Sequence, residues 1–289
     1  MQAVVVSAPG ALAYQQHPDP QPRPGWVLVE LRAAALNRRD LSVRNGNQPL
    51  PFPFVLGSDG AGIRRDTGEE VVILPSVAWG EREDAPGPDF RILGGLDDGT
   101  LAELIAIPEE NLFPKPARLG WEQAAAFPLA GLTAWRALFS KGGVQSGDTV
   151  VVLGAGSGVS TFVVQLAAQA GARVIVTSSS DEKLAAAAEL GADAGVNYRD
   201  NADWPAEVLA LAGGAGADVV IDSVGTTWPD SLRCVRAGGR IVSFGATGGP
   251  QSTVPSRDLF IRQVEIRGTT MGSPREFAAL LGAIDRGTW

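Results

Sequence analysis

The chain has little of what a metal centre or a disulfide requires. Its 289 residues include one cysteine, Cys234, and one histidine, His17. A single cysteine excludes a disulfide within the chain, which suits a reducing compartment. Zinc sites draw most of their ligands from Cys and His, so the sequence predicts no metal site. His17 lies in a proline-rich stretch, and we expect it at the surface rather than in nucleophilic catalysis.

Positive charge and long apolar runs are also scarce. Lys and Arg number 24 against 32 Asp and Glu, which gives a formal net charge of -8. Nucleic-acid-binding proteins usually present a basic face, so that class is not expected. No segment approaches the roughly 20 apolar residues of a membrane span, and the N-terminus lacks the regions of a signal peptide. We therefore expect a cytoplasmic protein that binds neither nucleic acid nor a membrane.

The sequence pattern changes near residue 118. Before that point, short β-type runs are separated by Pro and Gly, which predicts a mostly antiparallel β domain over residues 1–118. After it, apolar strands alternate with helical patterns. This alternation predicts a doubly wound parallel sheet over residues 119–289, entered through a helical bridge at 121–139. The expected strands are 149–153, 173–177, 194–198, 218–223, 240–244 and 265–270, and the expected helices are 158–170, 181–190, 202–211, 228–235 and 274–286.

A glycine-rich turn lies between the first of these strands and its helix. Glycines allow the backbone to approach a pyrophosphate, and the N–H groups at a helix N-terminus face the anion. Ser160 stands where a third glycine of the usual fingerprint is expected. The turn predicts a dinucleotide site that contains Gly154, Gly156, Ser157, Gly158 and Val159.

The residues after the second strand bear on which dinucleotide binds. NAD-binding proteins place an Asp or Glu there, about 20 residues past the glycine turn, on the ribose 2′-hydroxyl. This chain has Ser178 and Ser179 there, and Lys183 lies one helical turn further on. Hydroxyls and an ammonium suit a 2′-phosphate, so we expect NADP(H). Alternatively, the serines only cap the helix that begins at Asp181, whose negative charge counts against a phosphate.

Several motifs in order resemble a known family. They are Ala35-Leu-Asn-Arg-Arg-Asp40, Leu56-Gly-Ser-Asp-Gly-Ala-Gly62 and Phe127-Pro-Leu-Ala-Gly-Leu-Thr-Ala-Trp135, followed by the glycine turn. In these motifs the chain resembles the zinc-independent quinone and enone reductases of the medium-chain dehydrogenase/reductase superfamily. The resemblance implies a GroES-like substrate domain followed by a Rossmann nucleotide domain.

The resemblance also implies site residues. Related NADPH-dependent reductases pair a Ser and a Lys with a Tyr after the third strand, which matches Tyr198. Asn37 would polarise a substrate carbonyl, and Asp40 would orient Asn37 or a neighbouring Arg. Alternatively, Asn37 only caps the helical turn 38–44. Ser42 stands where such enzymes often carry a Tyr, so the proton donor is not identified. The residues expected around the nicotinamide are Thr133, Val224, Gly225, Phe244, Gly245 and Met271.

The zinc-dependent branch of the superfamily differs at its ligands. Its first catalytic cysteine would fall at Asn37 and its histidine at Ser58, and the region 79–93 has no cysteine for a structural zinc lobe. The expected function is therefore metal-free transfer of hydride from NADPH to a quinone or an α,β-unsaturated carbonyl, with solvent as the proton source. The alternatives are an NADP(H)-binding protein without turnover and a zinc-free alcohol dehydrogenase.

The last helix stands where the nucleotide domain would close. Family members usually continue with a segment that returns to the first domain, and we expect that segment to be absent here. An uncovered sheet edge pairs readily with another chain. Either the chain is a truncated version or this edge is uncovered, and we expect lower stability or altered assembly compared with full-length relatives. The expected oligomer is a homodimer.

Overall fold

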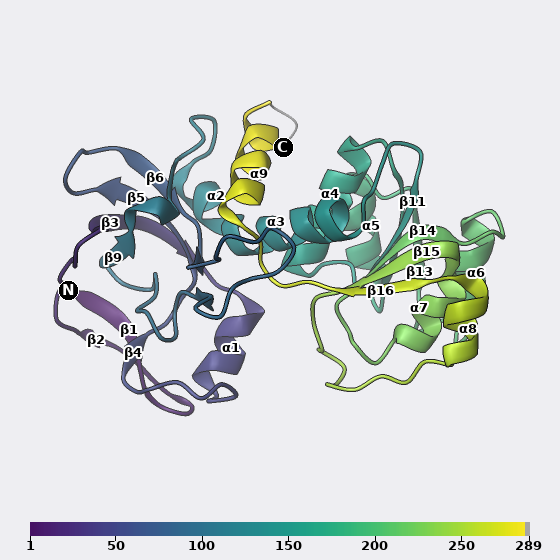
Figure 1. Ribbon diagram of the computed structural model, residues 1–289, viewed down its shortest axis with the longest axis horizontal. Coiled ribbons are helices and arrows are strands. Elements are labelled where there is room, and N and C mark those ends of the chain that lie inside the picture. The colour runs from purple at the N-terminus through teal and green to yellow at the C-terminus, as the bar shows by residue number, and fades with distance from the viewer. Residues whose placement is uncertain (287–289) are drawn as a thin grey trace. The chain divides into compact units, whose positions relative to one another are not determined.

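The computed structural model describes residues 1–286 (Figure 1). Contacts group residues 1–132 with 271–286 in one compact unit and residues 133–270 in another. The predicted domains, 1–118 and 119–289, differ from this division at both ends, because residues 119–132 and the C-terminal residues group with the first unit. Among the 286 described residues, no helix has the length and hydropathy needed to cross a membrane.

The second unit is built on a parallel sheet of six strands in the order β13-β12-β11-β14-β15-β16. This order is that of a doubly wound dinucleotide-binding fold. The predicted strands are confirmed, and β15 begins earlier than expected because its first residues already pair with β14. The strands are β11 (Thr149–Leu153), β12 (Arg173–Ser178), β13 (Ala194–Asn197), β14 (Ala217–Asp222), β15 (Val235–Ser243) and β16 (Glu265–Gly268).

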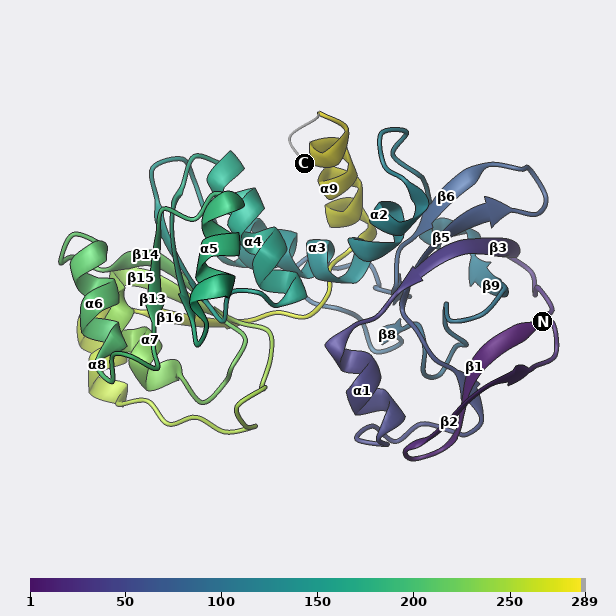
Figure 2. The ribbon, with the colours of Figure 1, turned by 180° about the vertical axis from the view of Figure 1, so that it is seen from behind.

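Side chains from alternate strand positions form two cores, one on each face of this sheet. Val150 and Val152 pack on the face covered by α4 (Gly158–Gln169) and α5 (Asp181–Glu189). Val151 and Leu153 pack on the opposite face, covered by α6 (Trp204–Leu211), α7 (Trp228–Cys234) and α8 (Ser256–Arg262). Figures 1 and 2 show these two layers of helices on either side of the strands. Burial on both faces explains the nearly unbroken Val and Ile runs in the strands.

The first unit is mostly antiparallel, as expected. One sheet has the order β2-β1-β4 and a larger one has the order β10-β6-β5-β3-β9. Val29, Ile73, Leu93, Ile105 and Ile107 form the main core beneath the larger sheet. Its elements are β1 (Gln2–Ala8), β2 (Ala11–Gln16), β3 (Trp26–Ala35), α1 (Arg38–Arg44), β4 (Phe54–Val55), β5 (Asp59–Arg64), β6 (Glu70–Ile73), β7 (Ser76–Val77), β8 (Arg91–Ile92), β9 (Leu104–Pro108) and β10 (Leu112–Pro114).

The predicted bridge at 121–139 is helical but not continuous. It consists of α2 (Trp121–Ala126), α3 (Pro128–Trp135) and a π-helical turn, Arg136–Lys141. A proline lacks the backbone N–H that would continue a helix, so Pro128 begins a new one. Ala124 and Ala125 of α2 pack against Ala61 of β5.

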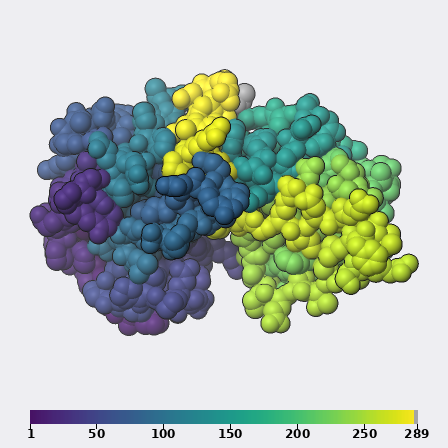
Figure 3. All heavy atoms as spheres, viewed as in Figure 1, coloured from purple at the N-terminus to yellow at the C-terminus, as the bar shows by residue number. Residues whose placement is uncertain are grey.

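Helix α9 (Pro274–Asp285) groups with the first unit and not with the nucleotide domain. Ser273 caps it, accepting a hydrogen bond from the Glu276 N–H at 3.2 Å. The Phe277 ring lies 5.0 Å from that of Phe113 on β10 and 5.9 Å from that of Phe127. In Figure 3 the yellow atoms of this C-terminal stretch lie beside blue atoms of the first unit. The expectation that the helix 274–286 closes the nucleotide domain is thus corrected, because α9 groups with the first unit.

Candidate functional site

The glycine turn joins β11 to α4 as the sequence predicts. Gly154 and Gly156 have φ angles of +77° and +88°, which L-residues rarely adopt. A Cβ added at Gly154 would meet no atom within 4 Å, so the backbone is open there. Ser157 is the N-cap of α4 and Gly158 its first residue, followed by Val159. The five predicted residues therefore form one continuous turn with an accessible backbone.

Ser160 replaces the third glycine and has a structural role. It is buried, and its N–H donates to the Ser157 hydroxyl at 3.2 Å. The two hydroxyl oxygens lie 2.7 Å apart. This pair fixes the start of α4 next to the turn.

The side chain of Lys183 lies against the glycine turn. Its Cγ, Cδ and Cε atoms are 2.9–3.4 Å from the position that a Cβ on Gly156 would take. Lys183 itself is on α5 and exposed. The structure thus brings a cationic side chain from the second βα unit to the turn predicted to hold a pyrophosphate.

The serines at the end of β12 differ in what they can reach. Ser178 is buried, and its hydroxyl accepts a hydrogen bond from the Ser180 N–H at 3.3 Å. Ser180 accepts from the Lys183 N–H at 3.4 Å, so the capping alternative holds for Ser180. Ser179 is only half-buried. Of the two predicted serines, Ser179 is better placed to meet a ligand.

Tyr198 follows β13 beside this strand end. Its N–H donates to the Ser178 carbonyl at 3.0 Å, and its side chain is 43% exposed. Asp181, whose charge counts against a phosphate, accepts a hydrogen bond from the Asn197 amide at 2.9 Å. Arg199, next to Tyr198, is an exposed cation that the sequence argument missed. Its signal was its place just after a strand, where NADP-binding folds can carry an arginine.

Residues predicted near the nicotinamide lie at the carboxyl ends of β14 and β15. The Gly248 N–H donates to the Val224 carbonyl at 2.8 Å, and a Cβ at Gly225 would lie 2.9 Å from the Gly249 carbonyl oxygen. The two loops are therefore packed together, and ligands of open α/β sheets bind at such ends. Gly245 belongs to the same packing, whereas Phe244 contacts the core on the α4 side.

Two further predicted residues stand apart from these loops. Thr133 is buried at the start of the second unit. Met271 is buried with a φ of +44° and groups with the first unit.

Asp222, at the end of β14, holds the first of these loops and was not singled out as a site residue. One carboxylate oxygen accepts from the N–H groups of Val224 at 2.8 Å and Gly225 at 3.1 Å. The other accepts from the hydroxyls of Thr227 at 2.7 Å and Ser231 at 2.8 Å. The acidic residue that begins Asp222-Ser-Val-Gly225 was the signal that could have identified it.

In the first unit, two carboxylates fix Asn37, which is the N-cap of α1. Asp40 accepts a hydrogen bond from the Asn37 backbone N–H at 2.7 Å. The side-chain amide donates to Asp59 of β5 at 3.0 Å. Asp40 thus orients the backbone as a capping residue does, whereas Asp59 orients the amide. The amide is therefore not limited to the capping role weighed from the sequence.

Asp59 was not predicted, although it lies within the Leu56–Gly62 motif. It is buried, and burial raises its pKa to about 7, against the effect of hydrogen bonds from Asn37 and the Leu129 N–H. The Leu129 N–H, at the start of α3, donates to its second oxygen at 2.9 Å. Burial also raises the pKa of Asp40, whose Oδ1 is buried with no hydrogen-bond partner. Two buried carboxylates thus lie on either side of Asn37.

Arg39 directly precedes Asp40 in the sequence and donates hydrogen bonds to neither carboxylate. Its Nη1 donates to the Ser58 hydroxyl at 2.7 Å and to the Leu93 carbonyl at 2.8 Å. Ser58 is buried and donates to the same carbonyl at 2.9 Å. The neighbours Ser58 and Asp59 therefore hold Arg39 and Asn37, respectively.

Comparisons with known proteins agree with this architecture. Residues 23–117 match an alcohol dehydrogenase GroES-like domain, and residues 158–286 match a zinc-binding dehydrogenase domain. A zinc-type alcohol dehydrogenase-like protein of Schizosaccharomyces pombe is 40% identical, over 91% of this chain and 81% of that protein. A quinone oxidoreductase of Pseudomonas aeruginosa is 33% identical, over 99% of this chain and 88% of that protein. A solved NAD-dependent alcohol dehydrogenase has a TM-score of 0.94 at 42% identity, over 100% of this chain and 90% of that one.

The chain belongs to the medium-chain dehydrogenase/reductase superfamily. The resemblance found in the sequence motifs is confirmed, as are the GroES-like and Rossmann folds. This medium-chain dehydrogenase/reductase is accordingly an oxidoreductase with a nicotinamide-dinucleotide-binding domain.

The donor set of this dehydrogenase/reductase does not fit a zinc ion. Asn37 and Ser58 are neutral, and a guanidinium already bonds to Ser58. Among residues 1–286, no group of three or more His, Cys, Asp and Glu side chains is arranged to hold a metal. In the loop expected to hold structural zinc in the other branch, the Trp79 ring packs on Phe90 at 5.2 Å. An aromatic contact therefore fills a loop that cysteines would otherwise cross-link.

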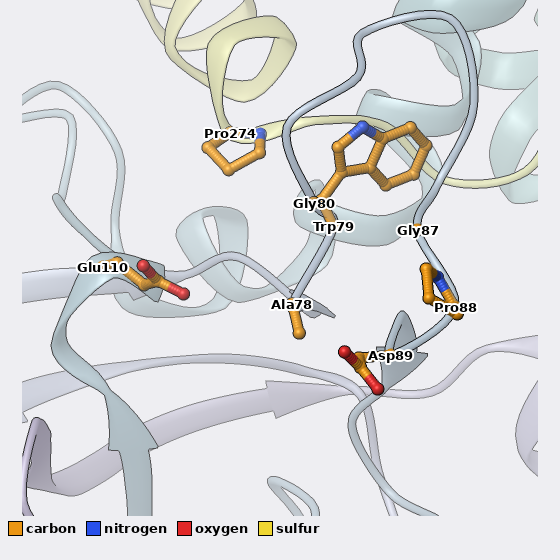
Figure 4. Close-up of a pocket in the computed structure, with 8 residues that line it drawn as sticks. All are labelled: Ala78, Trp79, Gly80, Gly87, Pro88, Asp89, Glu110 and Pro274. Carbon is orange, nitrogen blue, oxygen red and sulfur yellow. The ribbon is translucent and has the colours of Figure 1, made fainter.

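A cavity of about 340 Å³ lies in the same part of the first unit. Figure 4 shows the Trp79 ring within the arch of the loop from Gly80 to Gly87. The charged residues that line the cavity are two carboxylates, Asp89 and Glu110. A cavity with this negative charge does not suit an anionic dinucleotide. None of the predicted site residues lines this cavity.

Proposed function

We propose that this oxidoreductase is an NADPH-dependent, zinc-independent reductase of quinones or α,β-unsaturated carbonyls. The observation that carries the proposal is the donor set of the first unit. Where the zinc branch has metal ligands, this chain has the Asn37 amide, held by Asp59 at 3.0 Å, and Ser58, bonded to the Arg39 guanidinium. The Asn37 amide can donate a hydrogen bond to an oxygen, which is what reduction next to a carbonyl needs.

The glycine turn and its surroundings fit a phosphorylated dinucleotide. The open backbone at Gly154 and the N-terminus of α4 suit the pyrophosphate, and Ser179, Lys183 and Tyr198 suit a 2′-phosphate. When bound, the reduced nicotinamide supplies hydride. No acidic residue ends β12, which favours NADPH, although one similar solved structure is described as NAD-dependent.

The role of Asn37 follows from its hydrogen bonds. One amide hydrogen is directed to Asp59, and the other remains to donate to a substrate oxygen. Since its backbone is fixed by Asp40 and its amide by Asp59, little reorganisation is needed when charge develops on that oxygen. Water supplies the proton that completes the reduction.

Lys183→Ala should weaken the binding of NADPH more than the binding of NADH. We expect its dissociation constant for NADPH to rise about tenfold, because one charge-assisted hydrogen bond to phosphate is lost. The affinity for NADH should change less than twofold. Fluorescence titration of both cofactors measures this, with Arg173→Ala, at an exposed position at the start of β12, as the control. Equal losses for NADPH and NADH would argue against a 2′-phosphate site.

The reaction class is tested by NADPH and NADH consumption with a panel of quinones, enones and simple ketones. We expect NADPH consumption with enones or quinones, and a loss of about 100-fold in Asn37→Ala, the usual effect of deleting one preorganised donor. NADPH binding without turnover would instead identify the non-catalytic alternative. Turnover of simple alcohols and ketones alone would identify the alcohol dehydrogenase.

We also propose a cytoplasmic homodimer. The single, buried cysteine supports a reducing compartment. Strand β16 ends the order of the six-stranded sheet, and α8 before it exposes Phe260 at 64% and Ile261 at 60%. An unpaired edge strand beside exposed apolar side chains favours pairing with a second copy. This edge differs from the first-domain edge considered from the sequence.

A further inference from the structure

The guanidinium of Arg39 is firmly anchored on one side only. Both Nη1 hydrogens have acceptors, the Ser58 hydroxyl at 2.7 Å and the Leu93 carbonyl at 2.8 Å. A guanidinium carries five N–H donors, so three remain on Nε and Nη2. Within residues 1–286, no acceptor is recorded for these three.

The charge of Arg39 is also incompletely balanced. Burial lowers its pKa from the ordinary value, and Asp40 and Asp59 counteract this only through the field of their charges, without a direct hydrogen bond. An arginine nevertheless stays protonated in proteins. A half-buried cation with unused donors and no direct carboxylate partner is suited to a negatively charged or polarised oxygen.

The anchoring residues place Arg39 in the same cluster as Asn37. Ser58, which holds Arg39, precedes Asp59, which holds the Asn37 amide. Both donor groups come from the first turn of α1 and its cap. Asn37 and Ser58 are also the positions where the resemblance places ligands of the zinc branch. The cluster therefore has a fixed positive charge in the neighbourhood that a metal ion would otherwise occupy.

We propose that Arg39 is a catalytic residue that donates a hydrogen bond to the substrate carbonyl oxygen and supplies the positive charge that a metal ion supplies in zinc-dependent relatives. This inference rests on the proposed reductase function. It assigns a role to a side chain that the sequence motif leaves unspecified.

The chemistry balances for an enone. Hydride addition forms a C–H bond at the β-carbon, and the C=C electron pair moves to join the α-carbon and the carbonyl carbon by a new double bond. The carbonyl electron pair moves to oxygen and gives an enolate, while NADPH is oxidised to NADP⁺. Arg39 keeps its proton and stabilises the enolate oxygen through its hydrogen bond. Water then protonates the α-carbon, and the carbonyl re-forms.

Arg39→Ala is the direct test, with NADPH and 2-cyclohexen-1-one as the probe substrates. We expect kcat to fall about 100-fold, as when one oxyanion donor is removed, while the dissociation constant for NADPH stays within twofold. Millimolar guanidinium chloride should restore activity at least tenfold, whereas tetramethylammonium chloride at equal ionic strength should not. Arg38→Ala, at an exposed position on the same helix, should retain wild-type activity.

Two further variants keep the test decisive if Arg39→Ala folds poorly. Arg39→Lys retains the charge and loses the planar fork, and Ser58→Ala loses an anchor and retains the guanidinium. Both should lower kcat by about tenfold with little change in KM. Unchanged kcat in the Arg39 variants, or a loss in folded Arg39→Ala that guanidinium does not restore, would overturn the role of Arg39. A wild-type protein that reduces no enone or quinone would instead overturn the proposed function, and the Arg39 role with it.

Discussion

Replacement of Phe277 by alanine should destabilise the first unit by about 3–5 kcal/mol, the usual cost of truncating a buried phenylalanine. The side chain is fully buried on α9, and its ring lies 5.0 Å from that of Phe113 and 5.9 Å from that of Phe127. Truncation leaves a cavity between two rings that belong to different elements. Denaturant unfolding, followed by the fluorescence of tryptophans in each unit, measures the loss.

The matched control is Arg275→Ala, at an exposed position on the same helix, which should change the free energy of unfolding by less than about 0.5 kcal/mol. If Phe277→Ala were as mild as Arg275→Ala, α9 would not be an integral part of the first unit. A loss confined to the second unit would contradict the grouping of α9 with the first.

The position of α9 shows where the sequence pattern stops being informative. Its apolar periodicity and the Ser273 cap predict a helix, and the helix is found. The same pattern fits a crossover helix of the nucleotide domain equally well, because periodicity identifies the apolar face but not its partner. The partner is Phe113, more than 150 residues earlier in the chain, and only the folded structure shows that contact.

The second unit was more predictable because its signals are local. Strand β11, the glycine turn and α4 are consecutive in sequence, so residues 149–169 specify most of the pyrophosphate site. The position of the Lys183 side chain against Gly156 depends on the packing of a second βα unit. The sequence predicted Lys183 as a phosphate ligand but did not predict this position. Asn37 and Asp40 were identified through a motif, whereas Asp59 was missed because its bond to Asn37 joins two separate elements, β5 and the cap of α1.

Asp59→Asn should make the protein more stable relative to wild type as pH rises. Burial raises the pKa of Asp59 from 3.8 to about 7 in the folded protein. Between these values the folded state holds a proton that the unfolded state has released, so wild-type stability falls as pH rises through this window. At about 1.4 kcal/mol per pH unit, the loss between pH 5 and pH 8 is about 3 kcal/mol. An asparagine does not titrate, so the variant lacks this loss.

Urea unfolding at pH 5 and pH 8 gives the change in the free energy of unfolding between the two pH values for each protein. Subtracting the change in Asp59→Asn from that in the wild type cancels most of the contribution of the neighbouring groups Asp40 and Arg39. Glu122→Gln, at an exposed carboxylate on α2, should show no such dependence. Parallel pH profiles for wild type and Asp59→Asn would contradict burial as the cause of the raised pKa. The ionised form accepts hydrogen bonds from both Asn37 and the Leu129 N–H, whereas protonation turns one of the two oxygens into a hydroxyl, which is a weaker acceptor. Near neutral pH, folding therefore becomes less favourable because Asp59 ionises. The same ionised carboxylate is the better acceptor for the Asn37 amide, which it keeps directed at β5.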